Sequence, residues 1–187
     1  MKHTLVALVE DKPGVLNRVA SLFRRRAFNI ESLNVGHTDQ PHVSRMTIVI
    51  DSDNTSAHLV EANLSKLVNV IDIQDVTDLE TITRDLALIK VRVDAAGRAE
   101  IAQLAEIFRA KIVDVGTDSV VVEVTGDEEK IDGLVELLRP KGILEMVQTG
   151  RIAMVRGNQT ATRKNGNGSY NGNGHGQPVR DVGAGSV

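Results

Sequence analysis

Hydrophobic residues along the chain alternate between the spacing typical of strands and the spacing typical of helices. Residues 3–10 carry the apolar run Leu5-Val-Ala-Leu-Val9, which favours a strand, and the segment Asp11-Lys-Pro-Gly14 interrupts it. From Val15 to Phe23 apolar side chains recur every three or four residues, and arginines follow. This pattern predicts an amphipathic helix whose basic end suits the negative end of the helix dipole.

The same alternation continues along the chain and predicts the other elements. In the first half we expect extended segments at residues 29–38 and 42–50, a helix at 55–67 and a strand at 70–76. In the second half we expect a strand at 86–93, a helix at 98–109, a hairpin of residues 111–116 and 120–125, a helix at 128–138, and extended pieces at 143–147 and 152–155. The segment Leu22-Phe-Arg24 at the end of one helix is echoed by Ile107-Phe-Arg109 at the end of another. Two copies of one unit are therefore predicted.

Each unit has the order strand–helix–strand–strand–helix–strand, so the fold class is α+β with two tandem ferredoxin-like βαββαβ domains. We place the first domain at residues 1–78 and the second at 79–157. Residues 158–187 are rich in Gly, Asn and Ser and poor in apolar side chains, which predicts a disordered tail. A sheet with helices on one face leaves its other face and its edges in need of cover. Side-by-side pairing of the sheets of two copies would supply it, so we expect a homodimer.

Composition narrows the functional classes. The formal net charge of −3 and an aromatic content of 2% argue against nucleic-acid binding, which needs positive charge and stacking side chains. The chain has no cysteine, which excludes disulfides, thiolate metal ligands and a cysteine nucleophile. The apolar runs are too short to span a membrane, and Glu10, Asp11 and Lys12 interrupt the first of them. We expect a cytoplasmic protein that binds neither nucleic acid nor membrane.

The segment from Asp11 to Leu16 is the strongest candidate for a binding site. Free backbone N–H groups at the start of the first helix can receive a carboxylate, and Gly14 lets a ligand come close to the backbone. Asp11 and the amide of Asn29 can bind the ammonium group of an amino acid. Side chains of Val15, Leu16 and Ile30 would then form an apolar wall. We expect Asn29 to lie within reach of the same sheet edge as Asp11.

Taken alone, composition favours a simpler reading of this segment: an ordinary helix start at which nothing binds, because such turns are common. Several longer stretches of the sequence point more specifically to one protein family. The stretches Asp11-x-Pro-Gly-Val-Leu16, Phe28-Asn-Ile-Glu-Ser-Leu33 and Ser44-Arg-Met-Thr-Ile48 resemble the N-terminal ACT domain of the regulatory (small) subunit of acetolactate synthase, also called acetohydroxyacid synthase. The stretch from Ala105 to Val115 resembles the second domain of that family. The resemblance covers about residues 1–157.

The resemblance implies a regulatory role in branched-chain amino acid synthesis. In that family, valine binds between the ACT domains of two regulatory subunits and causes feedback inhibition. The glycine loop of one chain and the Asn-Ile strand start of the other line the site, which maps to Gly14, Val15 and Leu16 and to Asn29 and Ile30. Asp11 departs from members that have Asn at this position, which leaves its contact with the ligand open. An acid there would favour the ligand's ammonium group but repel its carboxylate.

The resemblance also implies that the chain is not itself an enzyme. A regulatory subunit of this family raises the activity of a large catalytic subunit, which is the expected partner. Thiamine diphosphate, Mg²⁺ and FAD belong to that large subunit, so no cofactor is expected in this chain. The second domain is the expected surface for partner activation, because it lacks the glycine-loop motif.

Other readings of the chain are weaker. A free-standing ACT-domain amino-acid sensor without an enzyme partner is the main alternative, and a small ferredoxin-like enzyme is another. His37 and His42 flank a turn and would be surface histidines rather than metal ligands, because no third ligand stands near them in the sequence. Arg24, Arg25 and Arg26 are expected to be a solvated helix end.

Overall fold

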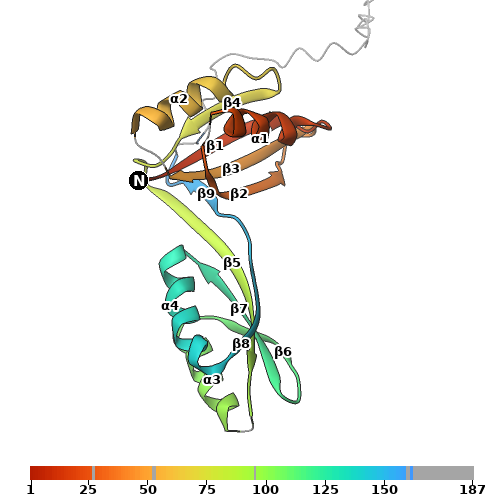
Figure 1. Cartoon of the computed structure of the whole chain (residues 1–187), viewed down its shortest axis with the longest axis vertical. Helices are drawn as coiled ribbons and strands as arrows, with labels where there is room; N and C mark the ends of the chain where they lie inside the picture. Colours follow the sequence, from red (N-terminus) through yellow and green to blue (C-terminus); the bar gives the residue numbers. More distant parts are fainter. Residues whose placement is uncertain (27, 52–53, 95, 159–160, 162–187) are drawn as a thin grey trace, which may run out of the picture.

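A computed structural model describes residues 1–26, 28–51, 54–94, 96–158 and 161, and within it side chains are described except those of residues 54–56. The chain forms two antiparallel sheets, each with two helices packed against it, and one long strand, β5, runs from the first half into the second (Figure 1). The fold class predicted from the hydrophobic pattern is confirmed. Among the residues described, no helix is long and apolar enough to cross a membrane.

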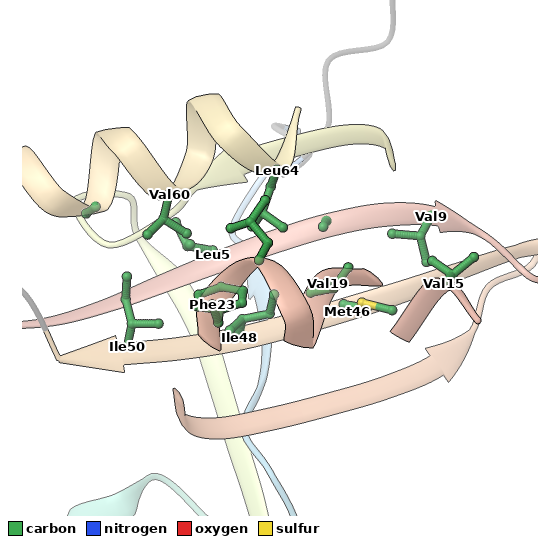
Figure 2. Packing of buried hydrophobic residues seen from close by; sticks show 13 residues of the cluster. Leu5, Val9, Val15, Val19, Phe23, Met46, Ile48, Ile50, Val60 and Leu64 are labelled. Atoms are coloured by element: carbon green, nitrogen blue, oxygen red, sulfur yellow. The ribbon is translucent and has the colours of Figure 1, made fainter. Parts of the chain in front are cut away.

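The first sheet is built from residues 2–75. Its elements are β1 (Lys2–Glu10), α1 (Val15–Arg25), β2 (Ile30–His37), β3 (Val43–Asp51), α2 (Asn54–Leu64) and β4 (Val70–Asp75). The strands lie in the order β2-β3-β1-β4, so β2 and β4 are its edges. Alternate residues of β1 and β3 point at the two helices, and there they form a core with Val19 and Phe23 of α1 and Leu64 of α2 (Figure 2).

The second half repeats the pattern. Its elements are β5 (Thr81–Arg92), α3 (Gly97–Ile107), β6 (Lys111–Val115), β7 (Ser119–Gly126), α4 (Glu128–Leu138), a 3₁₀ turn (Arg139–Lys141), β8 (Ile143–Gln148) and β9 (Ile152–Val155). The strand order β6-β7-β5-β8 matches that of the first sheet. Ile89, Val122 and Leu134 belong to the buried core between this sheet and its helices. Helix α4 begins at Asp127, whose side chain accepts a hydrogen bond from the Lys130 N–H.

The largest departure from the predicted elements is the start of β5. A strand was predicted from residue 86, but β5 begins at Thr81, because its first four residues pair with β9 in a separate two-stranded ribbon. The hydrophobic pattern missed this part because Thr81, Ile82, Thr83 and Arg84 alternate only weakly. The ribbon brings the last strand of the second half back to the first half.

That ribbon covers the face of the first sheet that has no helices. Ala153 and Val155 of β9 pack with Val6 and Val76, and together with Ala161 they form a third buried cluster. Val49 on the same face of β3 is also buried. We expected this face to need a partner that covers it. The ribbon of the same chain covers part of it. Most of the tail predicted at residues 158–187 lies outside the described residues, although Ala161 is described and is 4% exposed.

Candidate functional site

The start of α1 depends on the backbone freedom of Gly14. This residue has φ 85° and ψ −6°, a left-handed conformation that costs other residues about 1–2 kcal/mol. The chain can therefore turn from β1 into the helix within a few residues. A Cβ atom at Gly14 would meet no atom of the other described residues within 4 Å beyond its two chain neighbours, so the turn faces open space. This opening gives a small ligand direct access to the backbone.

The first N–H groups of α1 lack good acceptors among the described residues. The first regular helical bond runs from Arg18 N–H to the Gly14 carbonyl at 3.0 Å, and Val15 N–H reaches the Lys12 carbonyl at 3.4 Å. None of the described side chains caps the helix, and its first turn contains no acidic residue. The N–H groups of Leu16 and Asn17 therefore remain available, together with the positive end of the helix dipole.

The side chains around this turn divide between the core and solvent. Val15 is 5% exposed and belongs to the core, so it offers the site its backbone and not the apolar wall expected from the sequence. Leu16 is 47% exposed and is free to contact a ligand. The Asp11 N–H donates to the His42 carbonyl at 2.8 Å, and the Asp11 carboxylate lies 3.4 Å from His37 Nδ1. The end of β2 is thereby brought next to the turn.

Asn29 and Ile30 lie at the other end of the sheet. Ile30 and His3 both pair with Ile50 of β3, whereas Asp11 follows the opposite end of β1. The expectation that Asn29 reaches the same sheet edge as Asp11 is therefore wrong within one chain, because the whole length of α1 separates the two segments. Asn29 is exposed and Ile30 is half-buried. A second copy of the chain is needed to bring the two parts together.

A cluster of charged residues joins the two halves of the chain directly after Ile30. Lys2 Nζ lies 3.3 Å from the Glu31 carboxylate and 2.6 Å from that of Glu128, at the start of α4. The other oxygen of Glu128 lies 2.7 Å from Arg151 Nη2. The hydrogen bond to Glu128 raises the pKa of Lys2, and the same bond lowers the pKa of Glu128. Residue spacing does not reveal this cluster, because its members come from four separate segments of the chain.

Two further contacts tighten this junction. The Arg151 N–H donates to Ser32 Oγ at 2.8 Å. A Cβ atom placed on Gly150 would lie 2.4 Å from the Leu33 carbonyl oxygen, so only glycine permits the observed approach of the β8–β9 connection to β2. The segment after β8 is thus fixed against the strand that begins at Ile30.

Asp85 is the most buried acid of the junction. Its residue is 7% exposed, one oxygen accepts from Gln148 Nε2 at 3.2 Å, and the other lies 3.9 Å from Arg151 Nε. Burial raises the pKa of Asp85, and the charge of Arg151 opposes that rise. Arg151 therefore stabilises a carboxylate that would otherwise be costly to bury.

No group of three or more His, Asp or Glu side chains in the described part of the chain is arranged to hold a metal ion. His37 is 83% exposed at its side chain and faces Asp11. His42 is exposed and has a positive φ of 63°. Both histidines lie at the turn between β2 and β3, where their neighbours are other surface residues.

Comparison with known proteins decides the family. Residues 5–72 match the model of the "AHAS small subunit-like ACT domain", and residues 84–157 match that of the "small subunit of acetolactate synthase". The chain is 51% identical to a probable acetolactate synthase small subunit of Archaeoglobus fulgidus, over 85% of this chain and 99% of that protein. The chain belongs to the acetolactate synthase small-subunit family.

Two other members support this placement. The small subunit of Mycolicibacterium smegmatis is 50% identical over 83% of this chain and 91% of that protein. The crystal structure of the small subunit from Thermotoga maritima has a TM-score of 0.79 and 39% identity, and covers 85% of this chain and 99% of that one. The resemblance read from the sequence motifs is confirmed, and the similarity in structure extends over both halves.

Proposed function

We propose that this chain is the regulatory subunit of an acetolactate synthase, that it activates a large catalytic subunit, and that it confers feedback inhibition by valine or a related branched-chain amino acid. The observation that carries the proposal is the open helix start at Gly14, whose N–H groups at Leu16 and Asn17 have no partner among the described residues, in a chain of the small-subunit family. Chemistry would take place in the large subunit, which would hold thiamine diphosphate, Mg²⁺ and FAD.

A homodimer would complete the effector site. Strand β2 is an edge of the first sheet, so a second β2 can pair with it in antiparallel fashion. Pairing about the middle of β2 sets Ile30 of one copy opposite His37 of the other. Because His37 contacts Asp11 at 3.4 Å, the Asn29 side chain of the second copy would come beside the turn at Gly14. This arrangement resolves the separation of the two segments within one chain.

The completed site would suit both ends of a zwitterion. The N–H groups of Leu16 and Asn17 would receive the carboxylate, and the helix dipole adds to its attraction. The side-chain carbonyl of Asn29 from the second copy would accept from the ammonium group. The half-exposed Leu16 would contact a small apolar side chain. Asp11 stands close enough to add negative charge near the ammonium group.

We place the surface for the large subunit in the second half of the chain. Both edge strands of that sheet present apolar side chains to solvent: Val113 and Val115 of β6 are 50% and 60% exposed, and Val147 of β8 is 59% exposed. Exposed apolar residues at sheet edges are typical of surfaces that a partner covers. Effector binding would then have to favour one arrangement of the two halves over another.

The test is a valine titration of the holoenzyme, followed by calorimetry on the variant Gly14→Asp. The new carboxylate would occupy the N–H groups of the first turn itself, as an N-cap does, so valine binding should be lost. Gly14→Ala is the matched control, because it strains the same backbone but brings no acceptor. Unchanged valine affinity in Gly14→Asp would contradict the site. Activity of the large subunit that does not respond to this chain would contradict the regulatory role.

A free-standing amino-acid sensor remains the alternative. It would bind valine through the same turn but would have no enzyme partner. Co-purification separates the two: the proposal expects the large subunit to be retained on the immobilised chain, and the alternative expects valine binding with no such retention.

A further inference from the structure

A separate cavity lies on the face of the first sheet away from the helices, beside β9. It has a volume of about 350 Å³. Its lining comes from β2 and β3 on one side and from the β5–β9 ribbon on the other. Volumes of this size are typical of sites for small organic molecules. The cavity lies on the opposite face of the sheet from α1, and of its lining residues His37 is the one that contacts the proposed effector site.

The charged side chains that line this cavity are both cationic. Arg45 and Arg84 line it, and no Asp or Glu does among the residues described. Arg45 is half-buried, donates to the Ala153 carbonyl at 2.7 Å and has no carboxylate partner in the described part of the chain. Burial lowers the pKa of its guanidinium. A partly desolvated cation with free donors and no counter-charge is a costly arrangement that an anion would relieve.

The other wall of the cavity is apolar. Ile82 and Met154 pair across the ribbon and are 39% and 66% exposed, and Ile152 is 52% exposed. These three side chains line the cavity and do not belong to the buried cluster that Ala153 and Val155 form with Val6. Side chains of this kind favour a ligand with an apolar body next to the charged group.

We propose that this cavity binds a small organic carboxylate that has an apolar chain and no ammonium group. The guanidinium of Arg45 would pair with the carboxylate, Arg84 would add a second cation at the rim, and the ribbon would cover the chain. A zwitterionic amino acid is disfavoured, because its ammonium group would face two arginines without an acid to receive it. The site is thus chemically distinct from the effector site at Gly14, and does not depend on the proposed function.

The test uses sodium hexanoate as the probe, in calorimetry and NMR titration of the full chain. We expect saturable binding with shifts of the Met154 methyl group and of the Arg45 side chain. Hexan-1-ol has the same apolar body without the charge, and should bind at least about tenfold more weakly, because a charge-assisted hydrogen bond is lost. Valine should not displace hexanoate, and inorganic phosphate, which lacks an apolar body, should bind more weakly than hexanoate.

Variants separate the site from nonspecific binding. Arg45→Gln and Arg84→Gln should each weaken hexanoate binding, Arg45→Gln by about tenfold or more. Arg24→Gln, at an exposed position on α1, is the matched control and should bind as the parent chain does. Arg84→Gln keeps the test valid if Arg45→Gln unfolds, because Arg84 is exposed. Absence of saturable binding, equal binding of hexan-1-ol, tighter binding of phosphate, or affinity unaffected by either arginine substitution would overturn the proposal.

Discussion

Replacing Arg151 by Met should destabilise the chain in a way that depends on pH. The guanidinium lies 3.9 Å from an oxygen of the buried Asp85 and 2.7 Å from the half-exposed Glu128. At 3.9 Å and an effective dielectric constant near 20, the attraction to Asp85 is about 4 kcal/mol, which is an upper limit for the loss. The contact with Glu128 adds about 0.5–1 kcal/mol. Asp85 can take up a proton when its cation is removed, so we expect a net loss of about 2–4 kcal/mol at pH 8.

The sign of the pH dependence follows from the raised pKa of Asp85. An acid with a higher pKa in the folded state than in the unfolded state lowers stability as pH rises above its unfolded value, and the penalty is complete above its folded value. Arg151 limits that rise in the parent chain. In Arg151→Met the pKa of Asp85 should rise further, so the penalty should grow between about pH 4 and pH 8.

Urea unfolding at pH 5 and pH 8 measures the effect. The difference in unfolding free energy between the parent chain and Arg151→Met should be larger at pH 8. Asp85→Asn removes the titrating group while keeping its size, so the double variant should regain most of the loss and show little dependence on pH. An equal loss at both pH values, or no recovery in the double variant, would refute the assignment of the effect to Asp85.

Two smaller perturbations of the same junction can be measured alongside. Lys2→Met should cost about 1 kcal/mol or less, because Lys2 and Glu128 are 46% and 40% exposed at their side chains, and the difference should shrink in 1 M NaCl. A loss that salt leaves unchanged would mean that packing, not charge, is responsible. Gly150→Ala should cost about 1–3 kcal/mol, because its Cβ would lie 2.4 Å from the Leu33 carbonyl oxygen. Gly36→Ala, whose Cβ would meet nothing within 4 Å, is the control, and equal unfolding midpoints for both variants would contradict the close approach.

The hydrophobic pattern predicted helices and strands well where one face of an element is buried. Helix α4 was predicted at residues 128–138 and is observed over those residues, because its apolar side chains recur at helical spacing and Asp127 caps it. The start of β5 was not predicted, because residues 81–84 are half-buried or exposed and are held in a strand by backbone pairing with β9, which is far away in the sequence. Long-range contacts of this kind leave no periodic signal in the sequence.

The candidate site was predicted in part. The turn at Gly14 could be read from Pro and Gly between a strand and a helix, and the structure gives it an open backbone. The burial of Val15 could not be predicted from the sequence, because it depends on how α1 packs against the sheet. The separation of Asn29 from Gly14 follows from the register of β1 and β3, which only the fold defines.

The return of β9 to the first sheet also changes how the two halves can be studied. A truncation at Thr83 would remove the half in which we place the surface for the large subunit. It would also remove Ala153 and Val155, which bury Val6 on the face of the first sheet that has no helices. Loss of activation by such a truncated chain would therefore not distinguish a missing partner surface from an unfolded first half, and point substitutions on β6 or β8 are the sharper test.

The position of the charged junction bears on how an effector at one end of the chain would influence the other. Glu31 and Ser32 directly follow the proposed effector residues, and both contact groups of the second half, through Lys2 and through Arg151. Glu128 joins these contacts to the first turn of α4. If valine orders the start of β2 between two copies, then the backbone of Glu31 and Ser32 is fixed as well. Suppose that α4 can take two positions relative to the first half. Valine binding can then favour one position only if the contacts of the junction differ between the two. We expect this difference to lie in the junction and not in the core of either half, because cores are closely packed, whereas the junction is made of charged groups whose mutual attraction depends on their placement.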